Sequence, residues 1–394
     1  MTLLEGLRVL DFTRVVVGPI ASQLLADMGA EVYKVESIGV GDFSRQFFVR
    51  EGVNGVSPSF LALNRNKRSI CLDVRQPAGR EIALRLANVC DVVIQNFRPG
   101  VMERLGLDYP ALSRENPRLI YASASGYGLT GPRRLKAGQD LLAQAMSGVG
   151  WLTGEPDGPP MHAGPIIADY ACGLLLVQGI LAALWARERT GRGQAVSASL
   201  LDAMLHLQCE YLTAFLSSGH PERKNTRPLN RFYQTGDGKW LALSGTFGDN
   251  PVQEVCAALG LPDLSQDERF DTWEKANYTN GPALAEIFAE RFRTRTRAEW
   301  LTILEARDIL CAPVNTYAET FADEQVRQSV MVVEFDHPRA GRVRTIGLPI
   351  KFGQPAGAVR RPPPALGEHT DEILTMLDYS AEEIRRFRER RVVA

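Results

Sequence analysis

The chain has 394 residues, of which 45% are hydrophobic and 23% are charged, with 45 basic and 46 acidic side chains. This composition is ordinary for a globular protein, and the length predicts two domains, or one large domain that carries an insertion. Because the charges nearly cancel, net charge gives no reason to expect nucleic acid as a partner, and any anion site must be a local basic cluster.

Cysteine spacing and hydropathy indicate a cellular compartment. The six cysteines are widely scattered and form no C-x-x-C pair, which argues against a disulfide framework or a structural zinc site. The N-terminus has no signal-peptide pattern, and the longest apolar run, 174–185, is too short to span a bilayer. We therefore expect a soluble, cytoplasmic protein without a membrane partner.

The first 125 or so residues alternate between strand and helix patterns. The expected strands are 7–12, 31–36, 69–73, 92–95 and 119–123, and the expected helices are 20–28, 77–87 and 100–105. Successive βαβ units with right-handed crossovers produce a parallel sheet. The pattern thus predicts an open α/β sheet whose ligand loops follow the carboxyl ends of the strands.

The rest of the chain predicts a second, smaller α+β domain. Residues 139–217 are expected to be mainly helical, with a turn and a strand at 190–194, and a polar linker follows at 219–230. Beyond it we expect a strand at 238–244, helices at 251–259, 280–293 and 299–306, a turn at 312–315 and a charged helix at 381–391. The predicted domains are therefore 1–217 and 218–330, with 331–394 returning to the first.

Three basic clusters could bind an anion. They lie at 64–69, before a strand, at 96–100 with Arg104, after a strand, and at 133–136. Loops that follow neighbouring parallel strands meet at one edge, so two or three clusters could surround a polyphosphate, with Phe97 beside a base or an alkyl chain. Each cluster taken alone is better explained as solvated surface.

Asp169 is the strongest catalytic candidate. It lies between small residues at the expected start of a helix, just before the apolar run. Free N–H groups at a helix start favour the ionised form, and an ionised carboxylate that faces a cavity can act as a nucleophile or as a base. Aspartate is also a favoured N-cap, which is the simpler explanation for this residue alone.

The P-loop and the common hydrolase signatures are absent from the chain, and the first turn lacks the dinucleotide-binding signature. The chain has no P-loop, its first turn (13–19) lacks the G-x-G-x-x-G pattern, and neither G-x-S-x-G nor H-E-x-x-H occurs. An anionic nucleotide without a phosphate-loop motif, together with a lone carboxylate, points to coenzyme A. A carboxylate that attacks a thioester forms an acyl anhydride, which the thiolate can attack in turn. Neither step needs a metal.

The order and spacing of several short motifs resemble the class III CoA-transferases, the family of formyl-CoA transferase and the carnitine and bile-acid CoA-transferases. The likeness covers nearly the whole chain. It rests on LRVLDF (7–12), GP (18–19), ADMGAEVYKVE (26–36), NRNKRS (64–69), NF (96–97), GYG (126–128), TGRGQ (190–194) and LGEHTDE (366–372).

The resemblance implies a large Rossmann-like domain and a small domain in a ring-shaped subunit, and two rings that interlock as a homodimer. It places the nucleophilic aspartate at Asp169. It also implies that coenzyme A, bound as the acyl-CoA substrate, contacts Leu72, Arg75, Asn96, Phe97, Arg104 and Lys136. The chain departs from the formyl-CoA branch at Val16, at Ser37 and in lacking a glycine-rich loop near 236–250, which argues against formyl-CoA and oxalate as substrates.

Two other functions stay open. A 2-methylacyl-CoA racemase of the same fold needs two proton-transfer groups, and Gln139, which stands where that branch has a histidine, cannot move a proton. A non-catalytic acyl-CoA-binding protein would not need Asp169. For a transferase, Arg45, Arg50 and His162 could hold the second carboxylate of a dicarboxylic acceptor.

Overall fold

The computed structural model describes residues 2–219, 224–225, 227–353 and 357–394. The chain forms two compact units. The first contains Met1–Gly150, His162–Gly219 and Val330–Ala394, and the second contains Trp151–Met161 and His220–Ser329. Compared with the predicted ranges, Trp151–Met161 groups with the smaller unit.

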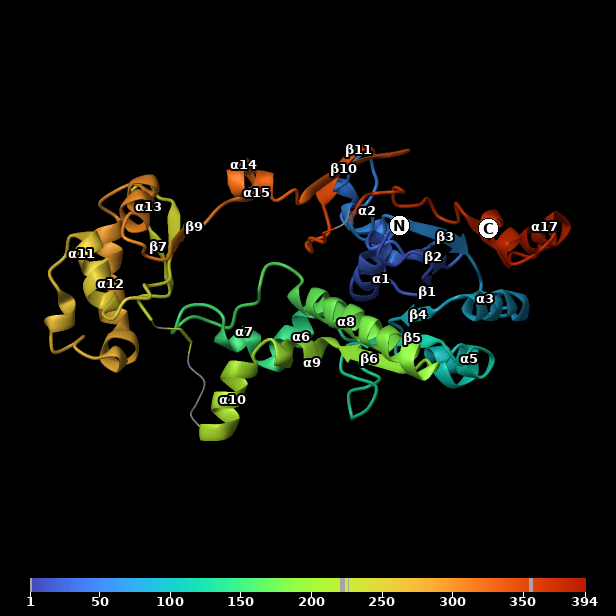
Figure 1. The fold of residues 1–394 in the computed structure, drawn as a ribbon, viewed down its shortest axis with the longest axis horizontal. Coiled ribbons are helices and arrows are strands. Elements are labelled where there is room, and N and C mark those ends of the chain that lie inside the picture. The colour runs from blue at the N-terminus through green and yellow to red at the C-terminus, as the bar shows by residue number, and fades with distance from the viewer. Residues whose placement is uncertain (1, 220–223, 226, 354–356) are drawn as a thin grey trace. The chain divides into compact units, whose positions relative to one another are not determined.

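The first unit is built on a six-stranded parallel sheet in the order β3-β2-β1-β4-β5-β6 (Figure 1). The strands are β1 (Arg8–Asp11), β2 (Glu31–Glu36), β3 (Lys67–Cys71), β4 (Val92–Gln95), β5 (Ile120–Ser125) and β6 (Ala195–Ser199). The order reverses between β1 and β4, and in open α/β sheets ligands bind outside the carboxyl ends of the strands at such a point. The α/β fold class and its parallel sheet are confirmed.

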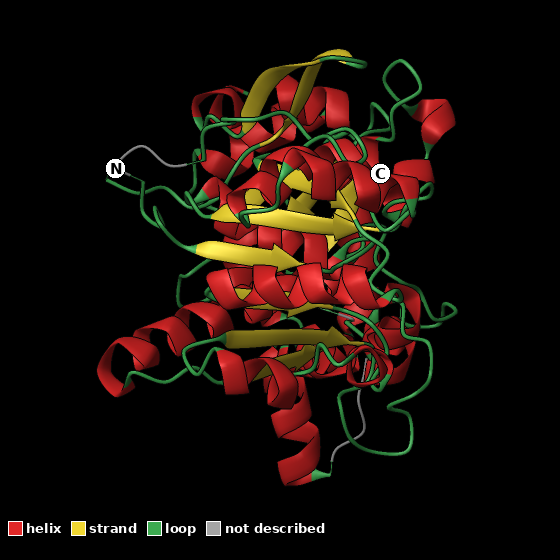
Figure 2. Cartoon of the chain, turned by 90° about the vertical axis from the view of Figure 1, so that its right-hand side faces the viewer, coloured by secondary structure: helices red, strands yellow, loops and turns green. Residues whose placement is uncertain are grey.

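Helices pack on both faces of this sheet (Figure 2). One face is covered by α1 (Val17–Asp27), α8 (Ile167–Thr190) and α9 (Leu200–His206), and the other by α3 (Pro77–Val89), α5 (Tyr109–Glu115) and α16 (Thr370–Met376). The remaining helices of this unit are α2 (Pro58–Leu63), α4 (Val101–Leu105), α6 (Asp140–Ser147), α10 (Cys209–Ser218) and α17 (Ala381–Glu389), with α7 (Val149–Leu152) at its boundary and short 3-10 turns at Phe43–Gln46 and Val49–Glu51.

The C-terminal segment covers the free edge of β3. The backbone N–H of His369 donates to the Ser69 carbonyl (2.9 Å), and the N–H of Asp73 donates to the Val392 carbonyl (2.9 Å). An uncovered edge strand would expose a row of unpaired backbone groups. The same segment carries the antiparallel hairpin of β10 (Val332–His337) and β11 (Gly341–Ile346), which the sequence pattern did not predict.

The second unit combines a three-stranded antiparallel sheet with helices. Its strands are β7 (Arg231–Gln234), β8 (Trp240–Leu243) and β9 (Cys311–Pro313), and its helices are α11 (Pro251–Leu259), α12 (Gly281–Phe292), α13 (Arg297–Glu305), α14 (Tyr317–Ala322) and α15 (Glu324–Gln328), with a 3-10 turn at Leu264–Gln266 and a π-helical turn at Lys275–Thr279. The turn predicted at 312–315 is wrong in part, because residues 311–313 pair with β8.

Helix α8 is longer than its apolar run suggested. It has 24 residues and, by length and composition alone, could cross a membrane. Cys172, Leu176 and Ile180 are nevertheless buried in the core that α8 shares with α1 and the sheet. The contact with α1 depends on Gly173, where an added Cβ would lie 2.3 Å from Cγ2 of Ile20.

We expect Gly173→Ala to lower the free energy of unfolding by about 1–3 kcal/mol, because the methyl group overpacks the α1–α8 contact. Urea unfolding of the purified protein measures the change. Gly164→Ala is the matched control, since nothing lies within 4 Å of a Cβ there. Equal stability of the two variants would contradict the prediction.

Candidate active site

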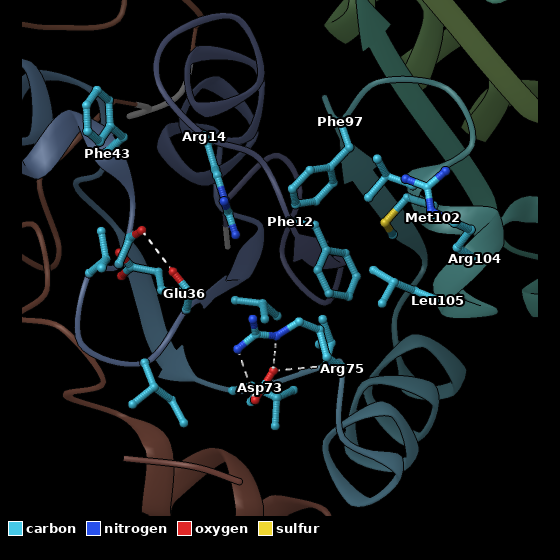
Figure 3. Close-up of a pocket in the computed structure, with 18 residues that line it drawn as sticks. Phe12, Arg14, Glu36, Phe43, Asp73, Arg75, Phe97, Met102, Arg104 and Leu105 are labelled. Carbon is cyan, nitrogen blue, oxygen red and sulfur yellow. Dashed lines mark hydrogen bonds and ion pairs between the residues drawn. The ribbon is translucent and has the colours of Figure 1, made fainter. Parts of the chain in front are cut away.

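A cavity of about 790 Å³ opens at the carboxyl ends of four neighbouring strands (Figure 3). Phe12 follows β1, Ser37 follows β2, Leu72 follows β3, and Phe97 comes soon after β4. Helix α4 supplies a further wall. The cavity therefore lies at the edge of the sheet where parallel α/β folds bind their ligands.

Three arginines and several apolar side chains line this cavity. Arg14, Arg75 and Arg104 come from the loops after β1 and β3 and from α4 (Figure 3). Arg75 forms an ion pair with Asp73 (2.8 Å), whereas among the described residues neither Arg14 nor Arg104 has an acidic partner. The cavity thus offers cations to an anion and the apolar surface of Phe97 to a ring or a chain.

Four of the six residues expected to contact coenzyme A line the cavity: Leu72, Arg75, Phe97 and Arg104. Asn96 lies beside it, where its side chain accepts a hydrogen bond from the Arg14 N–H (2.9 Å) and donates one to the Arg14 carbonyl (2.8 Å). Asn96 therefore fixes the turn that carries Arg14.

Lys136 is not among the residues that line the cavity. It is exposed on the loop 126–138, with its neighbours Arg133 and Arg134. The two ends of this loop cross at Gly126 and Gly138, where a Cβ on Gly126 would lie 2.5 Å from Cα of Gly138.

The basic cluster at 64–69 does not form an anion site, which corrects the expectation from sequence. Arg65 is buried against Asp27 (2.6 Å), and Lys67 is buried against Asp11 (3.2 Å). These residues lead into β3 at its amino end, so they do not join the loops that follow the strands. They neutralise buried carboxylates instead.

Arg45, a candidate for binding the acceptor acid, is also occupied. Its guanidinium donates two hydrogen bonds to the Glu36 carboxylate (2.8 and 2.6 Å) and lies 3.6 Å from the centroid of the Phe60 ring. A bidentate pair of this kind leaves little capacity for a second carboxylate. Arg50 and His162 remain exposed.

A buried ion pair holds the turn between the cavity and α1. Lys34 contacts Asp42 (2.8 Å) and donates to the Thr13 carbonyl (2.9 Å). Asp42 in turn accepts the N–H of Val15 (3.0 Å). Burial alone would raise the pKa of Asp42, but the charge and hydrogen bond of Lys34, together with the backbone N–H groups of Ser44 and Val15, lower that pKa to about 2. Val15 has φ +72°, a conformation that β-branched residues rarely adopt.

Asp169 lies in the first turn of α8 and is partly buried. Burial raises the pKa of Asp169 to about 6, the negative charge of Asp140 adds to this effect, and a hydrogen bond from the backbone N–H of Val17 opposes it. Asp169 therefore meets the N-terminus of α1 as well as that of its own helix. Both helix ends favour negative charge.

The turn from Phe12 to Val17 connects the two parts of the site. Phe12 and Arg14 line the cavity, and Val17 donates to Asp169. Sequence patterns did not reveal Arg14, Val17 or Asp140, because the first turn carries no glycine-rich signature and Asp140 is one of many aspartates at helix starts.

Comparison with known proteins identifies the family. The model of CoA-transferase family III matches residues 4–370. An acyl-CoA transferase of Fusarium pseudograminearum is 39% identical over 98% of this chain and 87% of its own length. A succinyl-CoA:glutarate CoA-transferase of Mus musculus is 36% identical over 94% of this chain and 85% of its own. A CAIB/BAIF family protein from Brucella suis, known from a crystal structure, superposes with a TM-score of 0.84 at 36% identity, covering 96% of this chain and 100% of that one. The chain therefore belongs to CoA-transferase family III, and it is an enzyme of that type.

Proposed function

We propose that this enzyme moves coenzyme A from an acyl-CoA donor to a carboxylic acid, with Asp169 as the nucleophile. The observation that carries the proposal is the turn 12–17, one end of which lines the arginine-rich cavity while the other end contacts Asp169. A ligand that places its phosphates in the cavity can extend along this turn and bring its thioester to the carboxylate.

In this proposal the phosphates of coenzyme A lie near Arg75 and Arg104, and Phe97 contacts the adenine or the pantetheine arm. Leu72 contributes apolar surface at the cavity wall, and Asn96 acts by holding the backbone of Arg14. The exposed loop around Lys136 would supply a further cation. No metal enters this scheme, because the thioester is already activated.

The proposed chemistry runs through two kinds of covalent intermediate on Asp169. The carboxylate attacks the thioester carbonyl, the C–S bond breaks, and the CoA thiolate leaves behind a mixed anhydride. The thiolate then attacks the aspartyl carbonyl, which releases the donor acid and forms an aspartyl thioester. The acceptor carboxylate attacks the carbonyl of that thioester, the C–S bond breaks, and a second mixed anhydride forms between Asp169 and the acceptor. The released thiolate attacks the acceptor's carbonyl in this anhydride, which forms the new acyl-CoA and restores the Asp169 carboxylate.

We propose a dicarboxylic acid as the acceptor. The name of the mouse relative, a succinyl-CoA:glutarate CoA-transferase, supports this class of acid. In this chain Arg50 and His162 are exposed and available, whereas Arg45 is bound to Glu36.

We also propose that the enzyme is cytoplasmic. All six cysteines are free, which is what a reducing compartment would maintain.

The resemblance to the family implies an interlocked homodimer, and the first unit has a surface that suits one. Large apolar side chains are exposed on α6, α8 and α10, including Leu142, Leu174, Trp185, Tyr211 and Phe215. Large apolar side chains that gather on a few helices of one unit support a partner surface there, because contiguous exposed apolar patches often mark protein–protein interaction sites. We expect sedimentation velocity to show a dimer at micromolar concentration, and a monomer at every concentration would contradict the proposal.

The role of Asp169 can be tested by trapping the covalent intermediates. We expect incubation with succinyl-CoA followed by hydroxylamine or borohydride to change the mass of the Asp169 peptide alone. Asp169→Ala should lower turnover by about 1000-fold or more and leave CoA affinity within about two-fold, because the nucleophile is lost and the cavity is intact.

Since the ionised carboxylate attacks, adduct formation should rise with pH through about 6 and level off above it.

Asp371→Asn is the matched control, because Asp371 also lies in the first turn of a helix, α16, away from the site. It should keep full turnover. An unmodified Asp169 together with exchange of the α-proton in a branched acyl-CoA would instead support a racemase. Full CoA binding by Asp169→Ala, in a protein whose wild type shows no turnover with any acid, would support a binding protein.

The placement of coenzyme A can be tested at the cavity wall. We expect Arg104→Ala and Phe97→Ala each to raise the dissociation constant for acyl-CoA by about 10-fold, through loss of a charge-assisted contact and of an apolar contact respectively. Lys136→Ala should have a smaller effect, because Lys136 does not line the cavity. Calorimetric titration measures the affinities, and Arg114→Ala, an exposed arginine on α5, is the control. Wild-type affinity in both cavity variants would contradict the placement.

A further inference from the structure

Helix α6 carries two polar side chains that hold the segment in front of Asp169. The Asp140 carboxylate accepts the backbone N–H of Ala168 through Oδ1 (2.6 Å) and the side-chain amide of Gln144 through Oδ2 (2.6 Å). Gln144 accepts the backbone N–H of Ala163 through Oε1 (2.9 Å). One chain of hydrogen bonds therefore ties both ends of the segment 163–168 to α6.

The direction of this chain follows from chemistry. The N–H of Ala163 can only donate, so the oxygen of the Gln144 amide must face it, and the amide nitrogen is then left to donate to Asp140. An ionised Asp140 only accepts, and both of its oxygens have a donor. Gln144 is fully buried, so water does not compete for its amide.

We infer that Gln144 is a positioning residue of the transfer reaction, which acts through Asp140 to fix the first turn of α8 and with it the carboxylate of Asp169. The inference rests on the proposed nucleophilic role of Asp169. Asp169 directly follows Ala168, whose N–H bonds to Asp140, so a shift of Asp140 moves the reacting atoms. A neutral amide orients Asp140 without adding a charge beside Asp169.

Few titratable groups surround the hydrogen bonds of Asp140 and Gln144. Asp140 is the carboxylate that acts on Asp169, and on α8 and α9 the neighbouring titratable groups are Tyr170, Cys172 and Asp202. The part of α1 that contacts this end of α8 presents Val17 and Ile20, which carry no charge. Arg65 acts on Tyr170 as well, but its guanidinium is paired with Asp27 (2.6 Å), and His162 lies exposed next to Ala163. A second carboxyl group in place of the Gln144 amide would therefore face the Asp140 carboxylate directly, while the arginine of this region is already paired with another carboxylate.

Gln144→Glu provides the test, because the new side chain has the same shape. At low pH its carboxyl group is protonated and donates to Asp140 as the amide does, whereas at higher pH two adjacent carboxylates repel each other and the chain opens. We expect the single-turnover rate of Asp169 adduct formation to fall by about 10- to 100-fold at pH about 8 and to approach the wild-type rate near pH 6. The affinity for acyl-CoA should stay within about two-fold, since the cavity is untouched.

Gln208→Ala is the matched control for Gln144→Ala. Gln208 is also buried and donates to two backbone carbonyls, those of Ser147 (3.1 Å) and Met204 (2.8 Å), but it has no bond to the segment 163–168. Both alanine variants should lose stability, and only Gln144→Ala should slow the adduct. If Gln144→Ala does not fold, Gln144→Glu at pH about 6 against pH about 8 decides alone.

A wild-type adduct rate and pH profile in Gln144→Glu would overturn the inference while leaving the role of Asp169 intact. Loss of acyl-CoA affinity in step with the adduct rate would overturn it as well, because it would show a general collapse of the unit. No adduct on the wild-type protein would overturn the proposed nucleophile and this inference together.

Discussion

The site depends on one buried ion pair, between Lys34 on β2 and Asp42 after it. Removing two charges from water costs several kcal/mol per ion, and only close contact and further hydrogen bonds repay that cost. The further bonds here go to the backbone of Thr13 and Val15, so the ion pair that neutralises itself also fixes the turn after β1. The same contacts hold Val15 at a φ of +72°, a conformation that costs about 1–3 kcal/mol in a residue other than glycine.

That turn links the cavity to Asp169. Its first half lines the cavity, and its end starts α1, whose first backbone N–H bonds to Asp169. The absence of a side chain at Gly173 then brings α8 against α1, so the proposed nucleophile and the turn that lines the cavity belong to one packed body. A change in the ion pair would therefore shift the position of Asp169 by moving the backbone of the turn, without any contact between the ion pair and Asp169.

The sequence predicted the parts of the fold whose strands are buried on both faces. The first five strands of the large sheet are almost entirely buried and were located within a few residues, whereas β6 is mostly exposed or half-buried and was placed too early. The strands β9, β10 and β11 are short or exposed and were missed. β9 has only three residues and pairs with β8, which lies far earlier in the chain. β10 and β11 pair with each other, but most of their side chains are exposed or half-buried, so they lack the apolar pattern of a buried strand.

The site was predictable only where residue type and strand position sufficed. Phe97 and Arg104 follow β4 closely, and both line the cavity. Arg65 and Lys67 are equally basic, yet they neutralise the buried carboxylates of Asp27 and Asp11. The sequence alone could not predict this, because it does not show which buried carboxylate each cation contacts. Asp140 and Gln144 act through tertiary contacts with the segment 163–168, which no local pattern could reveal.

The environment of Asp169 balances two requirements of a carboxylate nucleophile. A carboxylate of ordinary pKa is a weak base and therefore a weak nucleophile, whereas one with a pKa far above 7 would be protonated and inert. Burial and Asp140 raise the pKa of Asp169 to about 6, and the N–H of Val17 limits the rise. At pH about 7 such a group is still roughly nine-tenths ionised, and it is about a hundred-fold more basic than an aspartate in water. Asp140, which after burial contributes most to the raised pKa, also accepts the N–H of Ala168 in the first turn of the helix that carries the proposed nucleophile, so one side chain contributes both to its position and to its reactivity.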